Sequence, residues 1–533
     1  MCADGCGLGK TLQTITLLHS CLNRGPAGQP LMRKVMIVTP SSLVMNWHAE
    51  FRKWVGTRLE TVVATGDAGT MVKQFVQRHN IGNRVLLISY EMARKHMADL
   101  APVVDCVVCD EGHRLKSPQS QTAKALSTVR CRMRLLLSGT PLQNSLDEYY
   151  ACLDFVRPGG LPDWSSFTRA FQVPILRGAS PNASEVEKQA AARQWAVFQR
   201  MTNPYVLRRT SQVLVDLLPP KFEVILTVKL SLWQLDSYKK LTRAIATTPQ
   251  DNARGTFVIR ALGILRKFLN DPAICGKDVE VGDLSPVASP QVGGGLLVPV
   301  EAKSGGFDKD LQRVFSGRPQ GDVSAKLVVL EHLLGTFRAG FPGDKVVLVS
   351  MFTSMLDAAG RVCTKLGFKT LRLDGGTAGA KRMPIVNEFN KADGPEVLLL
   401  SSKAGGVGLN LIGANRLVML EPDWNPSNDW QAMCRVWREG QAKTVWVYRL
   451  VAGGTLEERI MGRQEAKEGL ARLVVDQEDG AAASLDHLKG LFAVPVPSVQ
   501  EWECDGGAGI PESLRGWLYN VLVTSGHGAS SPS

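Results

Sequence analysis

The stretch Val107-Val108-Cys109-Asp110-Glu111-Gly112-His113 decides the fold, because an apolar run ends there in two adjacent carboxylates. Four β-branched residues precede the carboxylates (Val103, Val104, Val107 and Val108), which is typical of a buried parallel strand. Open α/β sheets bind ligands at the carboxyl ends of such strands. Two carboxylates at that place suit a Mg²⁺-nucleotide site, with Asp110 holding the metal and Glu111 orienting the water that attacks the γ-phosphate. A strand that ends in a plain polar turn explains the same letters, so the prediction needs support from elsewhere in the chain.

A candidate phosphate loop lies upstream, in Asp4-Gly5-Cys6-Gly7-Leu8-Gly9-Lys10-Thr11, and leads into a helical run. Glycines let backbone N–H groups wrap phosphates, and a helix N-terminus favours negative charge. Asp4, Gly7 and Gly9 are therefore expected at a nucleotide. Lys10 is expected to reach the β- and γ-phosphates, and the Thr11 hydroxyl to bind Mg²⁺. The strict pattern has glycine where this chain has Asp4, and a glycine-rich turn without function is the alternative.

Only three residues precede this loop, whereas such a loop normally follows a buried strand. The first strand is therefore expected to be missing, and the chain to be truncated at its start. From residue 35 to 155, strand and helix patterns alternate, with strands expected at 35–39, 61–65, 85–90 and 134–137. This alternation predicts an α/β fold with a doubly wound parallel sheet over residues 1–157.

Two side-chain patterns in this first domain are predicted to be structural. Trp47, Phe51 and Trp54 recur at spacings of four and three, which is typical of the core-facing side of a helix. Cys106 and Cys109 could suggest a metal site, but alternation along a strand places them on opposite faces. Buried thiols are the favoured interpretation, since no second cysteine pair lies near.

A second α/β domain is predicted over residues 326–475, where alternation resumes at Val346–Ser350. The intervening residues 158–325 are predicted to form helical insertions and a connector, with one mobile loop at 281–306. Three glycines, a lysine and serines follow the strand expected at 397–401. They allow a backbone to approach a phosphate chain closely, with a tight structural turn as the alternative.

The segment Asp429–Gln441 has a helical pattern that places Arg435 and Arg438 three residues apart on one face. Two guanidinium groups on one face can clamp a transferring phosphate as arginine fingers. A solvated basic face, or an ion pair with Glu439, is the alternative.

The charge of the chain is unevenly distributed. Net charge is +12 at pH 7, yet residues 476–533 carry eight acidic and two basic side chains. The preceding part therefore has a large positive excess, which indicates a polyanionic partner. The last 58 residues are expected to be an acidic, partly disordered tail.

At 533 residues the chain is too long for one core, and no apolar run is long enough to cross a membrane. Its eleven scattered cysteines favour a reducing compartment.

Seven motifs occur together in one order. They are Asp-x-x-Gly-Leu-Gly-Lys-Thr (4–11), Asp-Glu-Gly-His-Arg-Leu-Lys-Ser (110–117), Leu-Ser-Gly-Thr-Pro-Leu-Gln-Asn (137–144), Ser-Ser-Lys-Ala-Gly-Gly-Val-Gly-Leu-Asn-Leu-Ile-Gly-Ala-Asn-Arg (401–416), Asp-Trp-Asn-Pro (423–426), Gln-x-x-x-Arg-x-x-Arg-x-Gly-Gln (431–441) and Gly-Thr-Leu-Glu-Glu-Arg-Ile (454–460). This set resembles the Swi/Snf family of double-stranded-DNA translocases. Within that family the chain is most similar to the eukaryotic recombination-repair subfamily of the Rad fifty-four type.

The resemblance implies two RecA-like lobes with ATP and Mg²⁺ as ligands. Lobe one would supply Lys10, Thr11, Asp110 and Glu111 to the nucleotide, and lobe two would supply Gln431, Arg435 and Arg438. DNA would contact loops at Thr39, Ser89, Ser350, Ser402, Lys403 and Gly405. The implied activity is translocation along duplex DNA in homologous recombination and chromatin remodelling, in the nucleus, on recombinase filaments or nucleosomes.

Three departures from the family pattern leave other interpretations open. Gly5-Cys6 stands where the family usually has Glu-Met, the extension that would meet a recombinase is absent, and Cys504 is the single cysteine of the tail. A nucleosome remodeller of the same family is one alternative. A non-catalytic DNA-binding scaffold, in which the missing first strand abolishes ATP turnover, is the other.

Overall fold

The computed structural model describes residues 1–5, 7–24, 28–77, 84–115, 120–131, 133–139, 146–178, 183–209, 217–247, 254–275, 324–402, 409–471 and 518–525. The chain divides into two compact units, the first built on Met1–Leu217 and the second on Leu218–Gln464. Each unit contains its own sheet and its own hydrophobic core. None of the helices within the described ranges is both long and apolar enough to cross a membrane.

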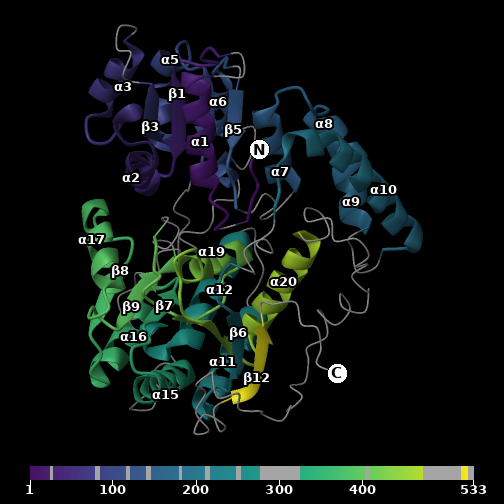
Figure 1. The fold of residues 1–533 in the computed structure, drawn as a ribbon. Coiled ribbons are helices and arrows are strands. Elements are labelled where there is room, and N and C mark those ends of the chain that lie inside the picture. The colour runs from purple at the N-terminus through teal and green to yellow at the C-terminus, as the bar shows by residue number, and fades with distance from the viewer. Residues whose placement is uncertain are drawn as a thin grey trace, which may run out of the picture. The chain divides into compact units, whose positions relative to one another are not determined.

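The first unit is organised around a five-stranded, parallel sheet with the order β2-β3-β1-β4-β5. Figure 1 labels β1, β3 and β5 of this sheet. Its strands are β1 (Val35–Thr39), β2 (Thr61–Val63), β3 (Val85–Ser89), β4 (Cys106–Cys109) and β5 (Met133–Leu136). Its helices are α1 (Lys10–Asn23), α2 (Val44–Val55), α3 (Ala68–Val76), α4 (Tyr90–Lys95), α5 (Met97–Leu100), α6 (Gln121–Ser127), α7 (Leu146–Val156), α8 (Trp164–Phe167), α9 (Val173–Gly178) and α10 (Glu185–Thr202). Strand order reverses between β1 and β4, so their carboxyl ends form the switch point at which such sheets bind ligands.

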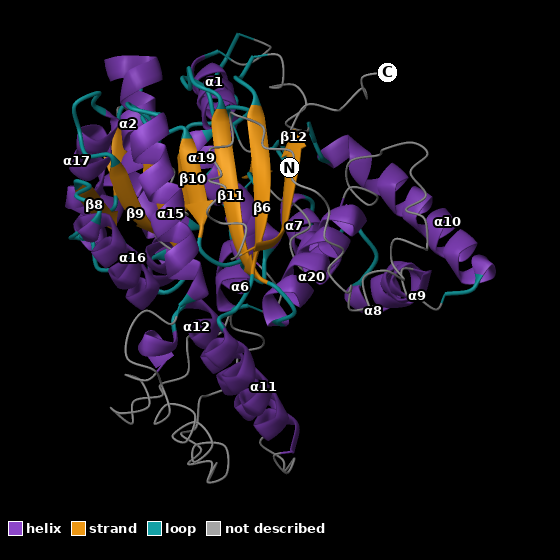
Figure 2. Cartoon of the chain, turned by 90° about the horizontal axis from the view of Figure 1, so that it is seen from below, coloured by secondary structure: helices purple, strands orange, loops and turns teal. Residues whose placement is uncertain are grey.

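The second unit contains a seven-stranded sheet with the order β12-β6-β11-β10-β7-β9-β8 (Figure 2). Its strands are β6 (Lys221–Val228), β7 (Val346–Ser350), β8 (Thr370–Leu373), β9 (Val397–Ser401), β10 (Arg416–Met419), β11 (Val445–Ala452) and β12 (Leu518–Ser525). Its helices are α11 (Leu232–Thr247), α12 (Arg254–Asn270), α15 (Ala325–Gly340), α16 (Thr353–Lys365), α17 (Gly379–Asn390) and α19 (Pro426–Val436), and α20 (Leu456–Ala471) begins in it. All pairings are parallel except that of β12 with β6.

The α/β class with two mostly parallel sheets is therefore confirmed, while the expected segment boundaries differ from those in the structure. The unit boundary lies at Leu217/Leu218, inside the segment predicted as insertions and connector. That segment supplies β6, and the segment predicted as an acidic tail supplies β12. Both strands lie at one edge of the second sheet, where β6 pairs with β11 along eight residues.

Residues 1–3 occupy a strand-like position beside β5. Cys2 forms parallel bridges to both Leu137 and Leu207, and its N–H donates to the carbonyl of Leu136 at 2.8 Å. The N–H of Ala3 donates to the carbonyl of Leu207 at 2.8 Å. The residues that lead into the glycine-rich loop are thus held between the end of β5 and the segment after α10.

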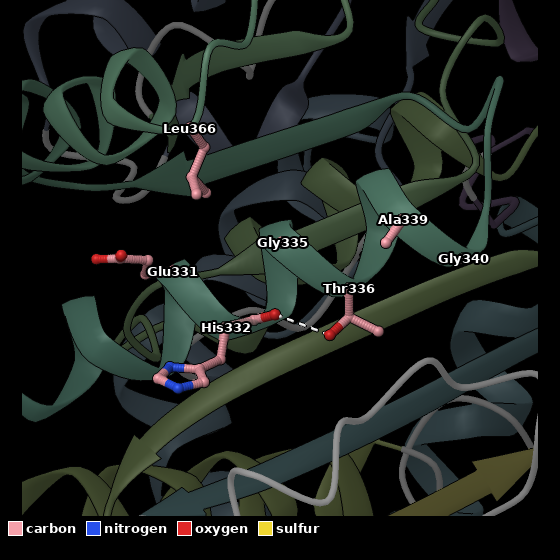
Figure 3. Close-up of a pocket in the computed structure, with 7 residues that line it drawn as sticks. All are labelled: Glu331, His332, Gly335, Thr336, Ala339, Gly340 and Leu366. Carbon is pink, nitrogen blue, oxygen red and sulfur yellow. Dashed lines mark hydrogen bonds between the residues drawn. The ribbon is translucent and has the colours of Figure 1, made fainter.

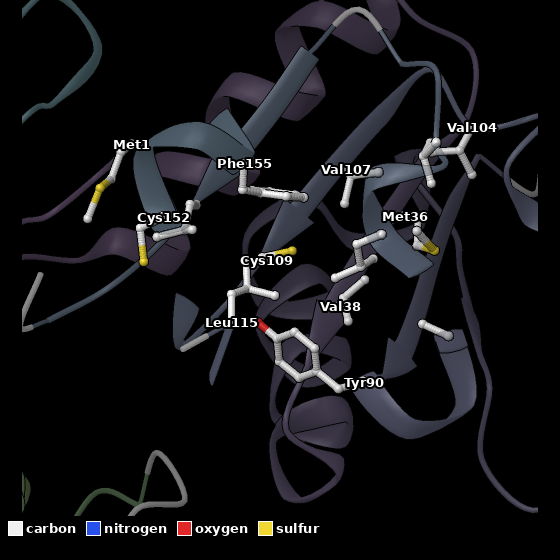
Figure 4. Packing of buried hydrophobic residues seen from close by; sticks show 14 of the residues in the cluster. Met1, Met36, Val38, Tyr90, Val104, Val107, Cys109, Leu115, Cys152 and Phe155 are labelled. Carbon is white, nitrogen blue, oxygen red and sulfur yellow. The ribbon is translucent and has the colours of Figure 1, made fainter. Parts of the chain in front are cut away.

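The core of the first unit joins strand and helix side chains (Figure 4). Val38 and Cys109 come from the two strands that flank the switch point, and Tyr90 and Leu115 pack in the same cluster. The predicted core stripe is confirmed for Trp47 and Phe51 but wrong for Trp54, which is 48% exposed. Cys106 and Cys109 are both buried free thiols, as predicted.

Candidate functional site

The glycine-rich loop forms a cradle at the N-terminus of α1. Gly7 and Gly9 have φ values of 90° and 73°, in the left-handed region that favours glycine. The first turn of α1 contains no acidic residue, and among the residues that the structure describes no side chain caps it. The ammonium group of Lys10 donates to the carbonyl oxygens of Asp4 and Gly5 at 2.9 and 3.1 Å. A helix N-terminus beside a lysine that donates to two neutral carbonyls fits a phosphate group.

Asp4, predicted to contact the nucleotide, is fully buried beneath the loop. Its carboxylate accepts hydrogen bonds from the Arg209 side chain and backbone, and from Gln13 Nε2 at 3.2 Å. Burial raises the pKa of Asp4, but the hydrogen bonds from Arg209 and Gln13 outweigh burial and leave the pKa below its usual value. Asp4 therefore connects the start of the loop to the segment after α10 through hydrogen bonds.

Asp110 lies at the carboxyl end of β4, at the switch point. Its Oδ2 accepts the indole N–H of Trp47 at 2.8 Å and lies 3.5 Å from the Thr39 hydroxyl, while its Oδ1 accepts the backbone N–H of Glu111 at 2.9 Å. Burial and the adjacent Glu111 carboxylate raise the pKa of Asp110, whereas the Trp47 N–H and the Lys10 ammonium act in the opposite direction. The Lys10 ammonium is therefore near enough to Asp110 to act on its charge. Asp110 and the half-buried Thr11 provide oxygen donors that fit Mg²⁺.

The turn after Asp110 has an unusual backbone. Glu111 has a φ of 51°, the one positive value of a non-glycine residue in the described ranges. A Cβ atom at Gly112 would lie 2.3 Å from the Leu136 side chain, so only glycine fits there. The backbone N–H of Gly112 donates to the Leu137 carbonyl at 2.9 Å, and the Tyr90 hydroxyl donates to the Asp110 carbonyl at 2.7 Å. Strained turns that are held this firmly are frequent at functional sites.

The structure corrects three of the predicted DNA contacts. Thr39, Ser89 and Ser350 do end their strands as expected, but they are 0, 6 and 2% exposed. Ser89 accepts the N–H of Met92 as the cap of α4, and the Ser350 hydroxyl donates to Glu421 at 2.8 Å. These hydroxyls form hydrogen bonds within the protein, because the side chains point inward where the strands end. Ser402 is half-buried. Lys403 and Gly405 lie outside the described residues.

The arginine pair is placed differently from the prediction. Helix α19 ends at Val436, and Trp437 has an extended backbone with φ −93° and ψ 91°. Arg435 is therefore in the last turn of the helix, while Arg438 lies beyond it and donates to the Leu409 carbonyl at 3.3 Å. The expectation that both lie on one helix face is wrong. Gln431 is half-buried one turn before Arg435.

Two features fix the loop after α19. Gly440, with a φ of 95°, lies in a turn that is closed by the Gln441 N–H donating to the Arg438 carbonyl at 3.0 Å. The buried amide of Gln441 donates to the carbonyls of Ala414 and Val436 at 2.7 and 3.1 Å, which satisfies the last carbonyl of the helix. The Gly-Gln pair thus fixes the loop that contains Arg438.

A shallow cavity of about 570 Å³ lies elsewhere in the second unit, along α15 and beside Leu366 (Figure 3). It is lined by Glu331, His332, Gly335, Thr336, Ala339, Gly340 and Leu366. The Thr336 hydroxyl is turned back onto the His332 carbonyl at 2.9 Å. None of the predicted site residues lines this cavity, so it gives no support to the predicted chemistry.

Sequence reasoning missed three residues of the site. Trp47 was assigned to the core, which is correct, but its indole N–H also holds Asp110. Arg209 and Gln13 carry no motif of their own, and they meet Asp4 only because the chain returns to the loop after α10. No spacing in the sequence indicates that contact.

Two family models match the chain in sequence order. Residues 1–274 match the SNF2-related domain, and residues 325–440 match the helicase conserved C-terminal domain. The first match covers just over half of the chain and contains all of the first unit's predicted site residues.

The chain is also similar to curated proteins. The protein CHROMATIN REMODELING 25 of Arabidopsis thaliana is 39% identical over 523 residues, which cover 92% of this chain and 55% of the relative. The DNA repair and recombination protein RAD54-like of Gallus gallus is 39% identical over 517 residues, which cover 94% of this chain and 67% of the relative. The human DNA repair and recombination protein RAD54B is 38% identical over 518 residues, which cover 95% of this chain and 56% of the relative. The chain therefore spans between about half and two thirds of the length of these relatives.

Among solved structures, the chain is similar to the Sulfolobus solfataricus SWI2/SNF2 ATPase core in complex with dsDNA. The sequence identity is 22%, the TM-score is 0.37, and the match covers 90% of this chain and 88% of that chain.

Proposed function

This chain belongs to the SNF2-related family of helicase-like proteins, and we propose that it is a DNA-dependent ATPase that translocates along double-stranded DNA. The observation that carries the proposal is the site of the first unit. The Lys10 ammonium at the phosphate loop acts electrostatically on Asp110 at the carboxyl end of β4, which supports one nucleotide site made from both. The names of the similar proteins, which refer to DNA repair, recombination and chromatin remodelling, support DNA as the activating ligand.

The roles of the first-unit residues follow from their contacts. Lys10, held by two neutral carbonyls, would exchange them for the β- and γ-phosphate oxygens, because an ammonium group binds an anion more strongly. Thr11 and Asp110 would hold Mg²⁺, which neutralises the charge that develops on the phosphates. Trp47 would keep the Asp110 carboxylate in one orientation. Glu111 would orient the attacking water, and its strained backbone would hold it in place.

The second unit would complete the reaction. Arg435 and Arg438 would stabilise the charge of the transferred phosphoryl group, which requires no shared helix face. Gln431 would contact the nucleotide. Ser402, Lys403 and Gly405 would contact the DNA backbone, and the basic excess of the chain supports a partner read through its phosphates. The cellular role proposed from the relatives is homologous recombination repair in the nucleus, on recombinase filaments or nucleosomes.

The test is ATP hydrolysis and DNA affinity of the whole chain, measured against salt with duplex DNA, single-stranded DNA and RNA. Duplex DNA of any sequence should stimulate hydrolysis far more than the other two ligands. The logarithm of the affinity should fall against the logarithm of salt with a slope of about −0.9 per phosphate neutralised. Lys403→Ala should reduce that slope by about one unit. Equal stimulation by RNA, or an affinity independent of salt, would contradict the proposal.

A nucleosome remodeller of the same family is the second candidate, because one relative is named for chromatin remodelling. Nucleosomes should then stimulate hydrolysis more than the same length of free duplex, and histones should move along the DNA. Equal stimulation by both ligands favours the translocase on free DNA.

A further inference from the structure

Lys221 is a buried lysine that lies between two tryptophans next to the proposed arginine clamp. Its side chain is 5% exposed. Its ammonium group lies 4.8 Å from the ring centre of Trp430 and 5.2 Å from that of Trp437. A cation is attracted by the face of an indole ring, and the attraction grows when water is excluded. Trp430 is inside α19 and Trp437 directly follows it, so one lysine of β6 contacts both ends of the turn that contains Arg435.

Glu223 balances the charge of Lys221 and extends the contact to a third element. The Lys221 ammonium lies 2.6 Å from the Glu223 carboxylate. Arg449 of β11 lies 3.4 Å from Glu223 and 3.2 Å from Asp429 in α19. Burial raises the pKa of Glu223, but the charges of Lys221 and Arg449 outweigh burial and lower it. A continuous series of charged groups therefore connects β6, β11 and α19.

Two hydrogen bonds hold the same helix at both ends. The indole N–H of Trp437 donates to the Pro219 carbonyl at 2.9 Å, just before β6 begins. The amide of Gln464 donates to the Asp429 carboxylate at 2.9 Å. The segment Pro219–Lys221 therefore contacts the C-terminal end of α19 through a hydrogen bond and through two ring faces.

Stability alone does not account for a charged side chain at this place. A buried ion pair is often no more stable than apolar side chains of the same volume, because both charges lose their hydration. A cation between two ring faces is directional, however, and it fixes where those rings lie. Arg435 lies between the two tryptophans in sequence, and Arg438 follows the second directly.

We propose that Lys221 is a positioning residue, and that its cage of Trp430, Trp437 and Glu223 holds α19 so that Arg435 and Arg438 reach the phosphates in the right orientation. The inference rests on the proposed ATPase function. The start of β6, just after the boundary between the units, would then influence the catalytic step of hydrolysis.

The first experiment measures ATP hydrolysis by the whole chain with saturating duplex DNA. Lys221→Met should lower kcat by tenfold or more and change the KM for ATP less than threefold, because the phosphate loop belongs to the other unit. Lys221→Arg keeps a cation that stacks on indole rings, and should retain kcat within threefold of the original chain.

The matched control is Lys345→Met in the same unit. Lys345 is also buried, at 6% exposure, and its ammonium group donates to the Phe389 and Gly394 carbonyls at 2.8 and 3.1 Å. Loss of this lysine should disturb the unit but leave kcat within threefold. A kcat loss in Lys345→Met equal to that in Lys221→Met would overturn the positioning role.

A second measurement does not depend on activity. Amide hydrogen exchange over residues 426–436 should be faster in Lys221→Met than in Lys345→Met. If Lys221→Met does not fold, Trp430→Leu removes one wall of the cage and should give the same faster exchange and the same kcat loss.

Arg438→Ala separates failure of the inference from failure of the proposed function. Unchanged hydrolysis in Arg438→Ala overturns the clamp itself. If Arg438→Ala is inactive while Lys221→Met has faster exchange but normal kcat, the clamp stands and the positioning role is overturned. The double variant Lys221→Met/Arg438→Ala should have a kcat only slightly lower than that of Arg438→Ala alone, because both residues act on the same step.

Discussion

Glu111 and Lys10 take different parts in the proposed reaction, so their substitutions should differ in kind. Lys10→Ala should weaken nucleotide binding and reduce hydrolysis by about 10³-fold or more, the range found for phosphate clamps. Glu111→Gln should stop hydrolysis while ATP and Mg²⁺ remain bound. Nucleotide affinity by titration calorimetry, beside the rate of phosphate release, distinguishes the two variants. An equal loss of affinity in both would make Glu111 a metal-binding or structural residue.

Trp47→Phe keeps the buried ring and removes one hydrogen bond. The indole N–H that holds Asp110 is lost, so the Mg²⁺ concentration needed for half-maximal hydrolysis should rise about 10–100-fold, as for other residues that orient metal ligands. Trp54→Phe is the matched control, because Trp54 is on the same helix but 48% exposed and bonded to Glu50. Its Mg²⁺ dependence should stay within twofold. A similar shift in both variants would assign the effect to helix α2 as a whole.

The residue types of the site could be predicted from the sequence, but the directions of several side chains could not. Asp110 follows a buried strand and Lys10 begins a helix, as their motifs predict. Thr39 and Ser350 also end their strands as predicted, yet both are buried. Whether a hydroxyl at a strand end points outward depends on the partner that the fold supplies, here Asp110 and Glu421.

The Asp4–Arg209 contact joins two elements, the phosphate loop and the segment after α10. Asp4→Asn should lower the free energy of unfolding by about 1–3 kcal/mol at pH 7, because Arg209 is partly exposed and loses only part of its stabilisation. The pKa of Asp4 is lowered in the folded state, so its contribution is present above the ordinary aspartate pKa of about 3.9 and is lost as pH falls below it. Unfolding experiments should therefore show the two proteins converging in acid. A constant difference down to the lowest pH would contradict an ionised pair.

Gly440 determines the loop that follows α19. Gly440→Ala should destabilise the second unit by about 1–2 kcal/mol, since its φ is 95° and a new Cβ would lie 3.2 Å from Ile412. Gly335→Ala is the control in the same unit, because Gly335 lies inside α15 with open space around it. That change should stabilise by about 0.5–1 kcal/mol. Denaturant unfolding measures the change in the free energy of unfolding for both variants. If both variants are destabilised, or both are stabilised, the backbone conformation of Gly440 does not explain its effect.

Strand and helix patterns predicted the elements that bury uniform apolar runs, such as β1, β7 and β9. They failed for β6, whose sequence begins with Lys221 and contains Glu223. These charges are buried because Trp430, Trp437 and Arg449 surround them, and sequence separation hides that environment. The helical pattern of residues 429–441 likewise continues past the true end of α19 at Val436, because the cap at Gln441 is a tertiary contact.

In the described part of the chain, the hydrophobic clusters that pack on the two sheets share no strand. Unfolding followed by hydrogen exchange should therefore give separate transitions, one for each unit. Asp4→Asn should shift the transition of the first unit alone, and Gly440→Ala that of the second alone. A single transition that moves equally in both variants would show that the units unfold as one body.

The pairing of β12 with β6 also constrains the order in which the protein folds during synthesis. The register joins Leu518 to Val228, so the 289 residues between them must be synthesised before the second sheet is complete. The sheet of the first unit, whose described strands all lie before residue 137, can form long before that. Until β12 arrives, β6 presents an unpaired edge, which is the kind of surface that chaperones cover and that promotes aggregation.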